Sequence, residues 1–295
     1  RFKKEESWIQ YYETPEKTYV SVDMTDLSSV SEDISDFITG KCNSLQRSLN
    51  ITEGPVIRAC LFKGHGDGKD RLFIAIHHLC IDMVSWRIIL GDFNRIYKRL
   101  SDGLTALLPG KTSSYRDWSE TLRDYVSEGE TYRPYWLSVL KDSTAMPVQY
   151  KESTYSDISN YKISMSCHET ELLLNNLPSA YNTQINDILL SALLMAFYRS
   201  LNVPDLLINL EGHGREETVA DVDLSRTAGW FTTIFPVRLK SPSMTDYGTI
   251  IKSVKETLRK IPDRGLSCGV LRYLSDNKEE LKELECKRVA FNYLG

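Results

Sequence analysis

Residues 71–82 read RLFIAIHHLCID, an apolar run that ends in two histidines and a carboxylate. The run itself, residues 71–76, follows the Gly- and Asp-rich residues 64–68, so it predicts a strand buried on both faces after a loop. Beyond the carboxylate, apolar residues recur at spacings of three and four, which predicts an amphipathic helix. They are Ile89, Phe93, Ile96 and Leu100. A buried strand that leads through a short joint into a helix indicates an α/β fold.

The start of this helix has two candidate caps, Asp82 and Ser85. Both side chains carry an oxygen that can accept a hydrogen bond from a backbone N–H group left free at a helix N-terminus. The spacing leaves open which of the two acts.

The rest of the chain alternates between helical and strand patterns joined by short polar segments, in keeping with an α/β fold. The predicted helices are residues 114–127, 132–140, 186–201 and 245–260, and a leucine-rich helix after the capping-box sequence SCHE of residues 166–169. The predicted strands are residues 206–210, 232–239 and 288–294. Pro236 removes a backbone donor, which predicts a sheet edge or a break in the ladder there.

The length of 295 residues is enough for two packed lobes. The polar stretch of residues 141–160 interrupts the helix and strand patterns. We therefore place the lobe boundary within it and expect lobes of residues 1–146 and 147–295.

Composition excludes several classes of partner. The net charge is −4 and no basic block is dense enough for a nucleic-acid face. No apolar run reaches the roughly 18 residues of a membrane helix, and the first residues lack the apolar core of a signal peptide. We expect a cytoplasmic protein that binds neither nucleic acid nor membrane.

The six cysteines contain no C-x-x-C pair, which argues against a zinc knuckle or a disulfide framework and fits a reducing cytosol. We interpret all six as packing residues. The five histidines include none with a partner at metal-ligand spacing, so no metal site is expected.

The adjacent His77 and His78 should point to opposite faces, because side chains alternate along a strand. Only one of them can then face a shared cleft. Histidine suits acid/base chemistry because its ordinary pKa lies near neutral pH. Asp82 could orient an imidazole, or could pair with an arginine and brace the turn. The alternative is that both histidines are core residues after a buried strand, with their ring nitrogens hydrogen-bonded inside the protein.

A second constellation, LLINLEGHGRE, spans residues 206–216 and places Glu211 at the end of a predicted strand. A carboxylate in that position is partly desolvated, as a general acid or base requires. The glycines beside His213 free the backbone to turn sharply. The alternative is a plain turn with Glu211 paired to Arg215. In the following segment RTAGWFT, residues 226–232, we interpret Trp230 as a packing residue.

The residues quoted above, taken together, resemble the epimerization domain of nonribosomal peptide synthetases, within the condensation-domain superfamily. The superfamily motif His-His-x-x-x-Asp-Gly reads HHLCIDM here, at residues 77–83, and Ser-Trp follows at 85 and 86. The glutamate block of residues 211–216 and the RTAGWFT segment are features of the epimerization type. Further matching blocks are NDILL (186–190), IP with residues 265–274, and FNYLG (291–295).

The resemblance implies a two-lobed fold similar to chloramphenicol acetyltransferase, with a central cleft or tunnel. The phosphopantetheine arm of a peptidyl carrier protein, linked upstream, would bring an aminoacyl or peptidyl thioester there, and neighbouring synthetase modules would be further partners. The reaction inverts the α-carbon, with His78 and Glu211 as the acid/base pair and with no bound metal or organic cofactor. The supporting residues that the resemblance implies are His77, Asp82 (in a bracing role), Ser85, Trp86, Asn292 and Tyr293.

The chain departs from the family pattern in places. Met83 stands where the motif has Gly. If the backbone there has a positive φ, methionine is strained. If the pantetheine arm passes close by, the larger side chain narrows the tunnel. The family's opening strand and first helix would precede residue 1, and further strands would follow residue 295, so we expect a domain truncated at both ends.

Three other functions remain as alternatives. A condensation domain that forms peptide bonds shares the histidines but does not need Glu211. A degenerate module that only docks a carrier protein would retain the site without using it. An unrelated CoA-dependent acyltransferase of the same fold would share the histidine motif without the later blocks.

Overall fold

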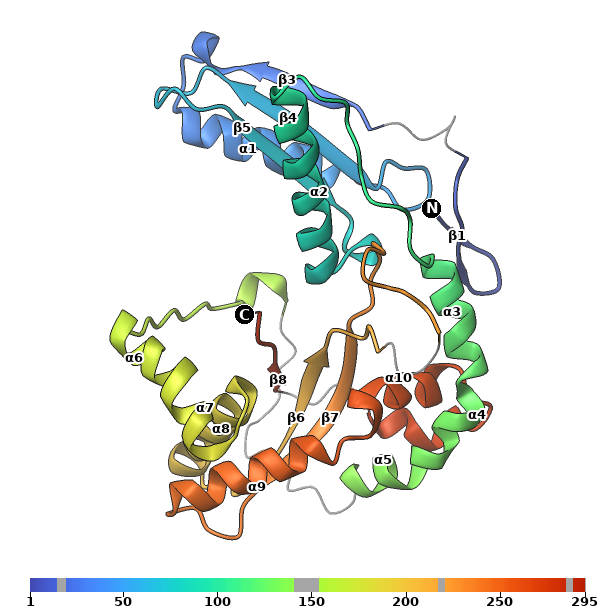
Figure 1. The fold of residues 1–295 in the computed structure, drawn as a ribbon, viewed down its shortest axis with the longest axis vertical. Coiled ribbons are helices and arrows are strands. Elements are labelled where there is room, and N and C mark those ends of the chain that lie inside the picture. The colour runs from blue at the N-terminus through green and yellow to red at the C-terminus, as the bar shows by residue number, and fades with distance from the viewer. Residues whose placement is uncertain (15–19, 141–153, 217–220, 285–288, 295) are drawn as a thin grey trace. The chain divides into compact units, whose positions relative to one another are not determined.

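The computed structural model describes residues 1–14, 20–140, 154–216, 221–284 and 289–294 (Figure 1). The strands are β1 Phe2–Lys4, β2 Trp8–Gln10, β3 Val22–Asp26, β4 Ile57–Lys63, β5 Arg71–Ile76, β6 Asp205–Gly212, β7 Thr233–Lys240 and β8 Ala290–Phe291. The α-helices are α1 Ile34–Arg47, α2 Met83–Ser101, α3 Tyr115–Asp124, α4 Val126–Gly129, α5 Arg133–Leu140, α6 Cys167–Glu171, α7 Leu177–Tyr181, α8 Ile185–Leu201, α9 Tyr247–Arg259 and α10 Leu266–Tyr273. Short 3-10 turns are η2 Leu27–Ser29, η3 His78–Cys80, η4 Glu130–Tyr132, η5 Tyr155–Asp157, η8 Pro262–Gly265 and η9 Lys278–Leu284, and η6 Leu172–Asn176 is a π-helical turn.

The chain forms two compact units. The first comprises Arg1–Tyr115 together with Ser225–Phe231, and the second comprises Arg116–Leu224 together with Thr232–Gly295. The lobes expected from the sequence stay a prediction. They differ from these units in two segments, because residues 116–140 pack with the second unit and residues 225–231 pack with the first.

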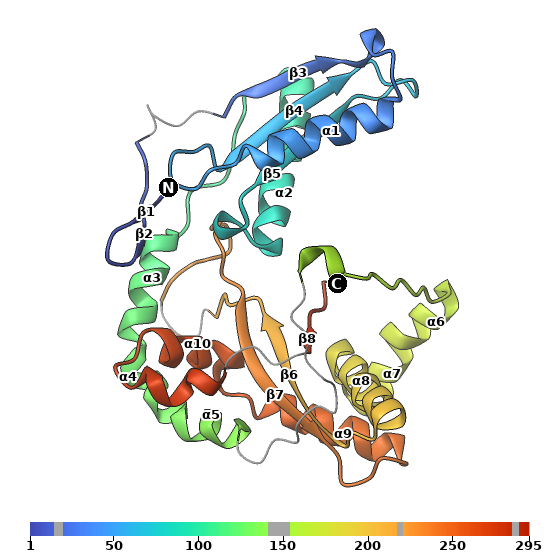
Figure 2. The same cartoon turned by 180° about the vertical axis from the view of Figure 1, so that it is seen from behind.

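The first unit contains a three-stranded sheet in the order β3-β4-β5, with β3 parallel and β5 antiparallel to β4 (Figures 1 and 2). The side chains of Cys60 and Phe62 on β4 are buried with Leu45 of α1. Asp33 caps α1 by accepting from the backbone N–H groups of Ser35 and Asp36. A separate hairpin pairs β1 with β2.

Strand β5 has the bounds that the sequence predicts, but the expectation that it is buried on both faces is wrong. It lies at the edge of its sheet, and Leu72 is 39% exposed. The side chains of a strand point above and below its sheet, so their burial depends on what packs against each face and not on the apolar sequence alone.

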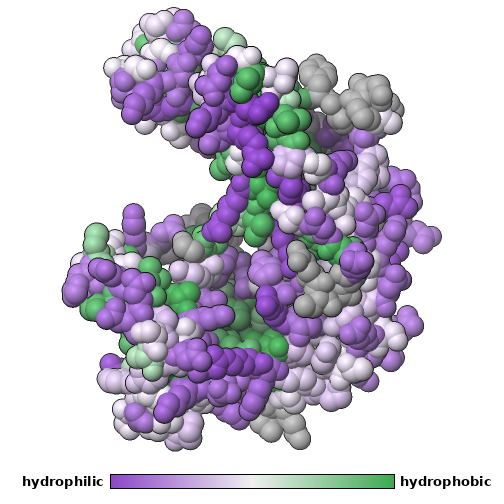
Figure 3. Space-filling model, in the orientation of Figure 1, coloured by the Kyte–Doolittle hydropathy of each residue, from purple (hydrophilic) through white to green (hydrophobic). Residues whose placement is uncertain are grey.

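Helix α2 begins as predicted after Asp82, whose Oδ1 accepts from the N–H group of Ser85 at 2.7 Å. Of the two candidate caps, Asp82 is therefore the one that acts. The apolar stripe is largely uncovered, since Phe93 and Leu100 are 46% and 57% exposed. Figure 3 shows hydrophobic residues at the surface over this helix. Periodicity thus predicts the helix correctly but not the burial of its apolar face.

The second unit is built on the sheet β7-β6-β8, in which β6 is antiparallel to β7 and parallel to β8. In Figures 1 and 2, α8 and α10 lie on opposite sides of the β6–β7 pair. The core gathers buried side chains from the strands and from the helices around them. They include Leu206, Ile208, Val237 and Leu239 from the sheet, and Trp136, Leu190, Leu194, Ile250, Val254 and Leu271 from the helices.

Pro236 predicts a sheet edge or a break in the ladder, and the structure shows the edge, because β7 pairs with β6 alone in the described part of the sheet. The capping box at Ser166 is confirmed as well, although α6 passes into a π-helical turn and then α7 instead of forming one long helix. The final strand is shorter than predicted. In the described residues it spans Ala290–Phe291, and residue 288 lies outside them.

The five described cysteines are free. Cys60 and Cys268 are buried as expected, and burial raises the pKa of the Cys268 thiol to about 12. Cys167 is exposed at the start of α6, so its interpretation as a packing residue is wrong. Cys286 lies outside the described residues. Among the helices that the structure describes, none combines the length and the apolar character needed to cross a bilayer.

Candidate active-site elements in the two units

The backbone around His78 is fixed by local hydrogen bonds. The N–H group of His77 donates to the carbonyl of Val56 at 2.9 Å, which continues the β5 ladder by one residue. The N–H group of Cys80 then donates to the carbonyl of His77 at 2.8 Å and closes the turn η3. Ile81, which follows, is buried and anchors the end of the turn. The histidines therefore stand on a rigid junction between β5 and α2.

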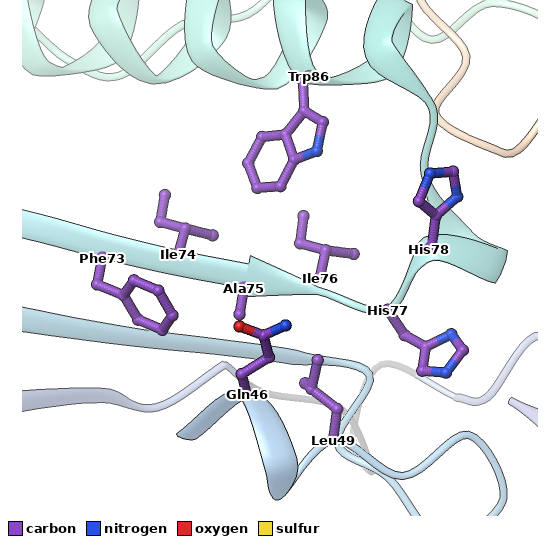
Figure 4. Close-up of a pocket in the computed structure, with 9 residues that line it drawn as sticks. All are labelled: Gln46, Leu49, Phe73, Ile74, Ala75, Ile76, His77, His78 and Trp86. Carbon is purple, nitrogen blue, oxygen red and sulfur yellow. The ribbon is translucent and has the colours of Figure 1, made fainter. Parts of the chain in front are cut away.

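The two histidine side chains point away from each other, as alternation predicts (Figure 4). His77 turns back on its own turn, where its Nδ1 accepts from the N–H group of Leu79 at 3.3 Å. His78 lies on the other side and is exposed. Neither is a buried core residue, so the core-packing alternative does not describe this pair.

The imidazole of His78 contacts the indole of Trp230 edge to face, with ring centroids 5.4 Å apart and an angle of 72° between the rings. Among the described residues, the ring nitrogens of His78 make no hydrogen bond. Trp230 is 37% exposed and lies against the histidine, so its interpretation as a packing residue is wrong.

Asp82 and Ser85 hold the segment that carries this tryptophan. Asp82 is buried, and its Oδ2 accepts from the N–H group of Phe231 at 3.2 Å. Ser85 is fully buried, and its Oγ donates to the carbonyl of Gly229 at 2.9 Å and accepts from the N–H group of the same residue at 3.1 Å. These bonds give Asp82 a bracing geometry of the kind that the resemblance implies.

A further ion pair fixes the same segment. Arg226 donates through Nη2 to both carboxylate oxygens of Asp92 on α2, at 2.7 and 2.9 Å. Both side chains are partly buried, which reduces the screening of this pair by solvent. Asp92 is not predicted from the sequence. Its position on α2, ten residues after the cap, carries no local signal for a partner so far along the chain.

Gly229 is required by close packing. A Cβ placed there would overlap the ring of Tyr115, which also contacts Phe231 edge to face with centroids 5.0 Å apart. The hydroxyl of Tyr115 donates to the carbonyl of Trp230 at 2.7 Å. The backbone of residues 229–231 is thus held from two sides.

A cavity of about 540 Å³ runs along β5 in the first unit (Figure 4). Its lining residues are Gln46, Leu49, Phe73, Ile74, Ala75, Ile76, His77, His78 and Trp86. Figure 4 shows Ile74, Ile76 and Trp86 on the same side of β5 as His78, and Gln46 and Leu49 on the other side. The half-buried Trp86 therefore forms part of the apolar wall beside the histidine.

In the second unit, Glu211 lies near the end of β6, opposite Ile234 of β7. Its Oε2 accepts from Nδ2 of Asn292 at 2.5 Å. Asn292 reaches it because β8 pairs with β6 directly beforehand, at Leu210 and Phe291. Among the ion pairs of the described residues, none joins Glu211 to Arg215, and Nη1 of Arg215 donates to the carbonyl of Leu224.

A second charged cluster, which is not predicted from the sequence, follows Glu211. Glu216 is buried, and desolvation raises the pKa of its carboxyl group. Nε2 of His213 and Nη1 of Arg264 each lie 3.5 Å from its oxygens. Asp263, in the neighbouring turn, is partly buried, and desolvation raises the pKa of its carboxyl group as well. Glu216 closes the block of residues 211–216, which is the signal that could have marked it.

Met83 is the first residue of α2, is 48% exposed and does not have a positive φ. The backbone strain considered for this departure is therefore absent. Tyr293 is 40% exposed. His78 belongs to the first unit and Glu211 to the second. In the described part of the chain, no three His, Cys, Asp or Glu side chains form a group that could hold a metal ion.

Comparisons with known proteins give a consistent picture. The family profile described as "Condensation domain" matches residues 1–295. The solved structure of the epimerization domain from the third module of tyrocidine synthetase B is 30% identical, with a TM-score of 0.88 over 99% of this chain and 67% of that one. VibH, an NRPS condensation enzyme, is 17% identical with a TM-score of 0.64, over 86% of this chain and 58% of that one. These likenesses show that the chain has the condensation-domain fold.

Two curated relatives are bacterial synthases. Bacitracin synthase 2 of Bacillus licheniformis is 41% identical over 85% of this chain. Tyrocidine synthase 1 of Brevibacillus parabrevis is 36% identical over 89% of this chain. The chain spans 10% of the length of the first relative and 25% of the second.

Proposed function

Since the chain belongs to the condensation-domain family, we propose that it epimerizes the α-carbon of an aminoacyl or peptidyl thioester carried on the phosphopantetheine arm of a carrier protein. The observation that carries this proposal is the pairing of Glu211 with Asn292. Epimerization needs a second proton-transfer group besides the motif histidine, and a half-buried carboxylate oriented by an amide supplies one. The likeness to a solved epimerization domain supports the same assignment.

The reaction is a proton exchange. A thioester makes the adjacent α-proton more acidic than an amide does, and loss of that proton leaves an enolate whose oxygen is stabilised by nearby donors. In the proposed mechanism His78 and Glu211 are the acid/base pair. One group removes the α-proton, and the other returns a proton to the opposite face of the carbon. The step consumes no redox equivalent and needs neither a metal nor a bound organic cofactor.

The surroundings of the two groups fit this role. Among the described residues, His78 makes no hydrogen bond through its ring nitrogens, while His77 uses Nδ1 within its own turn. Among the described residues, Glu211 makes its side-chain hydrogen bond through Oε2, to Asn292. Trp86 belongs to the wall beside His78, and Tyr293 follows Asn292 as a further supporting residue. The carrier protein and neighbouring synthetase modules are the proposed partners, and the proposed location is the cytoplasm.

The test is uptake of solvent deuterium at the α-carbon of a thioester loaded on the carrier protein, in deuterated buffer. We expect uptake without chain extension, and a loss of about 100-fold or more in His78→Ala and in Glu211→Gln. His65→Ala is the matched control, because His65 lies in the loop after β4 and pairs with Asp67. It should leave the rate unchanged.

The same assay separates the alternatives. A condensation domain would form a peptide bond with an acceptor without deuterium uptake and would tolerate Glu211→Gln. A degenerate docking module would show neither reaction, and both substitutions would be silent. Either result would refute epimerization.

A further inference from the structure

The imidazole of His78 makes a ring contact with a neighbouring indole. Among the described residues, its nitrogens have no hydrogen-bond partner, and its ring lies edge to face with Trp230 at 5.4 Å. A hydrogen bond to a carboxylate would orient the ring but would occupy one nitrogen. A contact with an indole orients the ring and leaves both nitrogens open.

Trp230 is itself held by its neighbours in the chain. Gly229 is bonded through both its N–H and its carbonyl to Ser85, and Phe231 is bonded through its N–H to Asp82. Asp82 caps α2 and Ser85 lies in the first turn of that helix, directly after the turn η3 that begins at His78. The histidine and the tryptophan are therefore both held at the start of α2, which limits their relative movement.

We infer that Trp230 is a positioning residue, which holds the His78 imidazole in a single orientation for proton transfer. This inference rests on the proposed function. Edge-to-face contacts favour one side-chain rotamer by about 2- to 10-fold, and a misplaced proton-transfer group lowers the rate further. Ser85 and Asp82 act through Trp230, because they fix the backbone on both sides of it.

The test compares Trp230→Leu and Trp230→Phe in the full-length polypeptide with its loaded carrier protein. We expect Trp230→Leu to lower kcat for deuterium uptake about tenfold with little change in KM, and Trp230→Phe to stay within about threefold of the wild type because a ring edge remains. The matched control is Trp8→Leu, since Trp8 is 56% exposed on β2 of the same unit. It should change neither kcat nor KM.

A second readout does not depend on activity. In protein with ¹³C-labelled histidine, the Cε1–H signal of His78, assigned with His78→Gln, should be displaced by the ring current of Trp230. The displacement should disappear in Trp230→Leu and persist in Trp8→Leu, while the other histidine signals stay in place. A merely structural role of Trp230 would not move the His78 signal selectively.

The outcomes distinguish a failure of the proposed function from a failure of the positioning role of Trp230. No deuterium uptake by the wild type refutes the proposed function. Uptake by the wild type with Trp230→Leu within twofold of it, or with an unmoved His78 signal, refutes the positioning role alone. A loss that appears in KM, or that depends on the size of the aminoacyl side chain, would show that Trp230 contacts the substrate, and this too would overturn the inference.

Discussion

Replacing Ser85 by alanine removes one hydroxyl from a fully buried position, where it serves two backbone groups of Gly229. The helix cap survives, because Asp82 accepts from the backbone of residue 85 and not from its side chain. The Gly229 N–H and carbonyl would both lose their partner, and an unpaired buried polar group costs about 1–3 kcal/mol. The higher helix propensity of alanine stabilises the folded state by about 0.5 kcal/mol and offsets part of this cost. With two such groups, the expected loss in unfolding free energy is about 1.5–5.5 kcal/mol.

Urea denaturation followed by tryptophan fluorescence measures this loss, with the slope of the transition as a check that the denatured state is unchanged. Ser101→Ala is the matched control. It lies on the same helix, and its hydroxyl donates to the carbonyl of Tyr97 at an exposed position. That change should stay within about 0.5 kcal/mol. If Ser85→Ala costs no more than Ser101→Ala, the two bonds to Gly229 do not hold the segment, and the reasoning is refuted.

Three further perturbations probe other parts of the two units. Asn292→Leu should lower deuterium uptake about 10- to 100-fold with KM little changed, since Glu211 loses its orienting donor; a large rise in KM instead would contradict this. Gly229→Ala should destabilise the protein by about 1–3 kcal/mol, because the added methyl group overlaps the tyrosine ring that it faces, and an unchanged melting temperature would show that the ring moves aside freely. Hydrogen bonds from Arg133 lower the pKa of Glu130 from its ordinary value of 4.5 to about 2. A depressed carboxyl pKa stabilises the folded state above pH 4.5, and this contribution is lost as the pH falls towards 2. Glu130→Gln should therefore flatten the fall in melting temperature between about pH 5 and 3, and the same fall in both proteins would refute the assignment.

Much of the local structure follows from the sequence, because it depends on neighbours a few residues apart. The apolar run of residues 71–76 predicts β5 with its observed bounds. The sequence SCHE predicts the capping box at Ser166, and Pro236 predicts the edge strand β7. Each of these rests on backbone chemistry that acts within one turn or one ladder position.

Burial could not be predicted in the same way. The apolar character of β5 suggested two covered faces, but the strand lies at a sheet edge. The stripe on α2 has helical spacing, yet Phe93 is 46% exposed. Periodicity reports which residues share a face, and coverage depends on what packs against that face.

The sequence by itself determined the family motif, the rigid junction that presents His78, and the strand end that presents Glu211. Only the tertiary structure decided what orients each group. Ser85 meets Gly229 across 144 residues, Asp82 meets Phe231 across 149, and Asn292 meets Glu211 across 81. Such partners are brought together by sheet pairing and packing, and no local spacing encodes a hydrogen bond between residues so far apart in the chain. For the same reason Trp230, which reads as a packing residue in sequence, lies in the structure against the histidine.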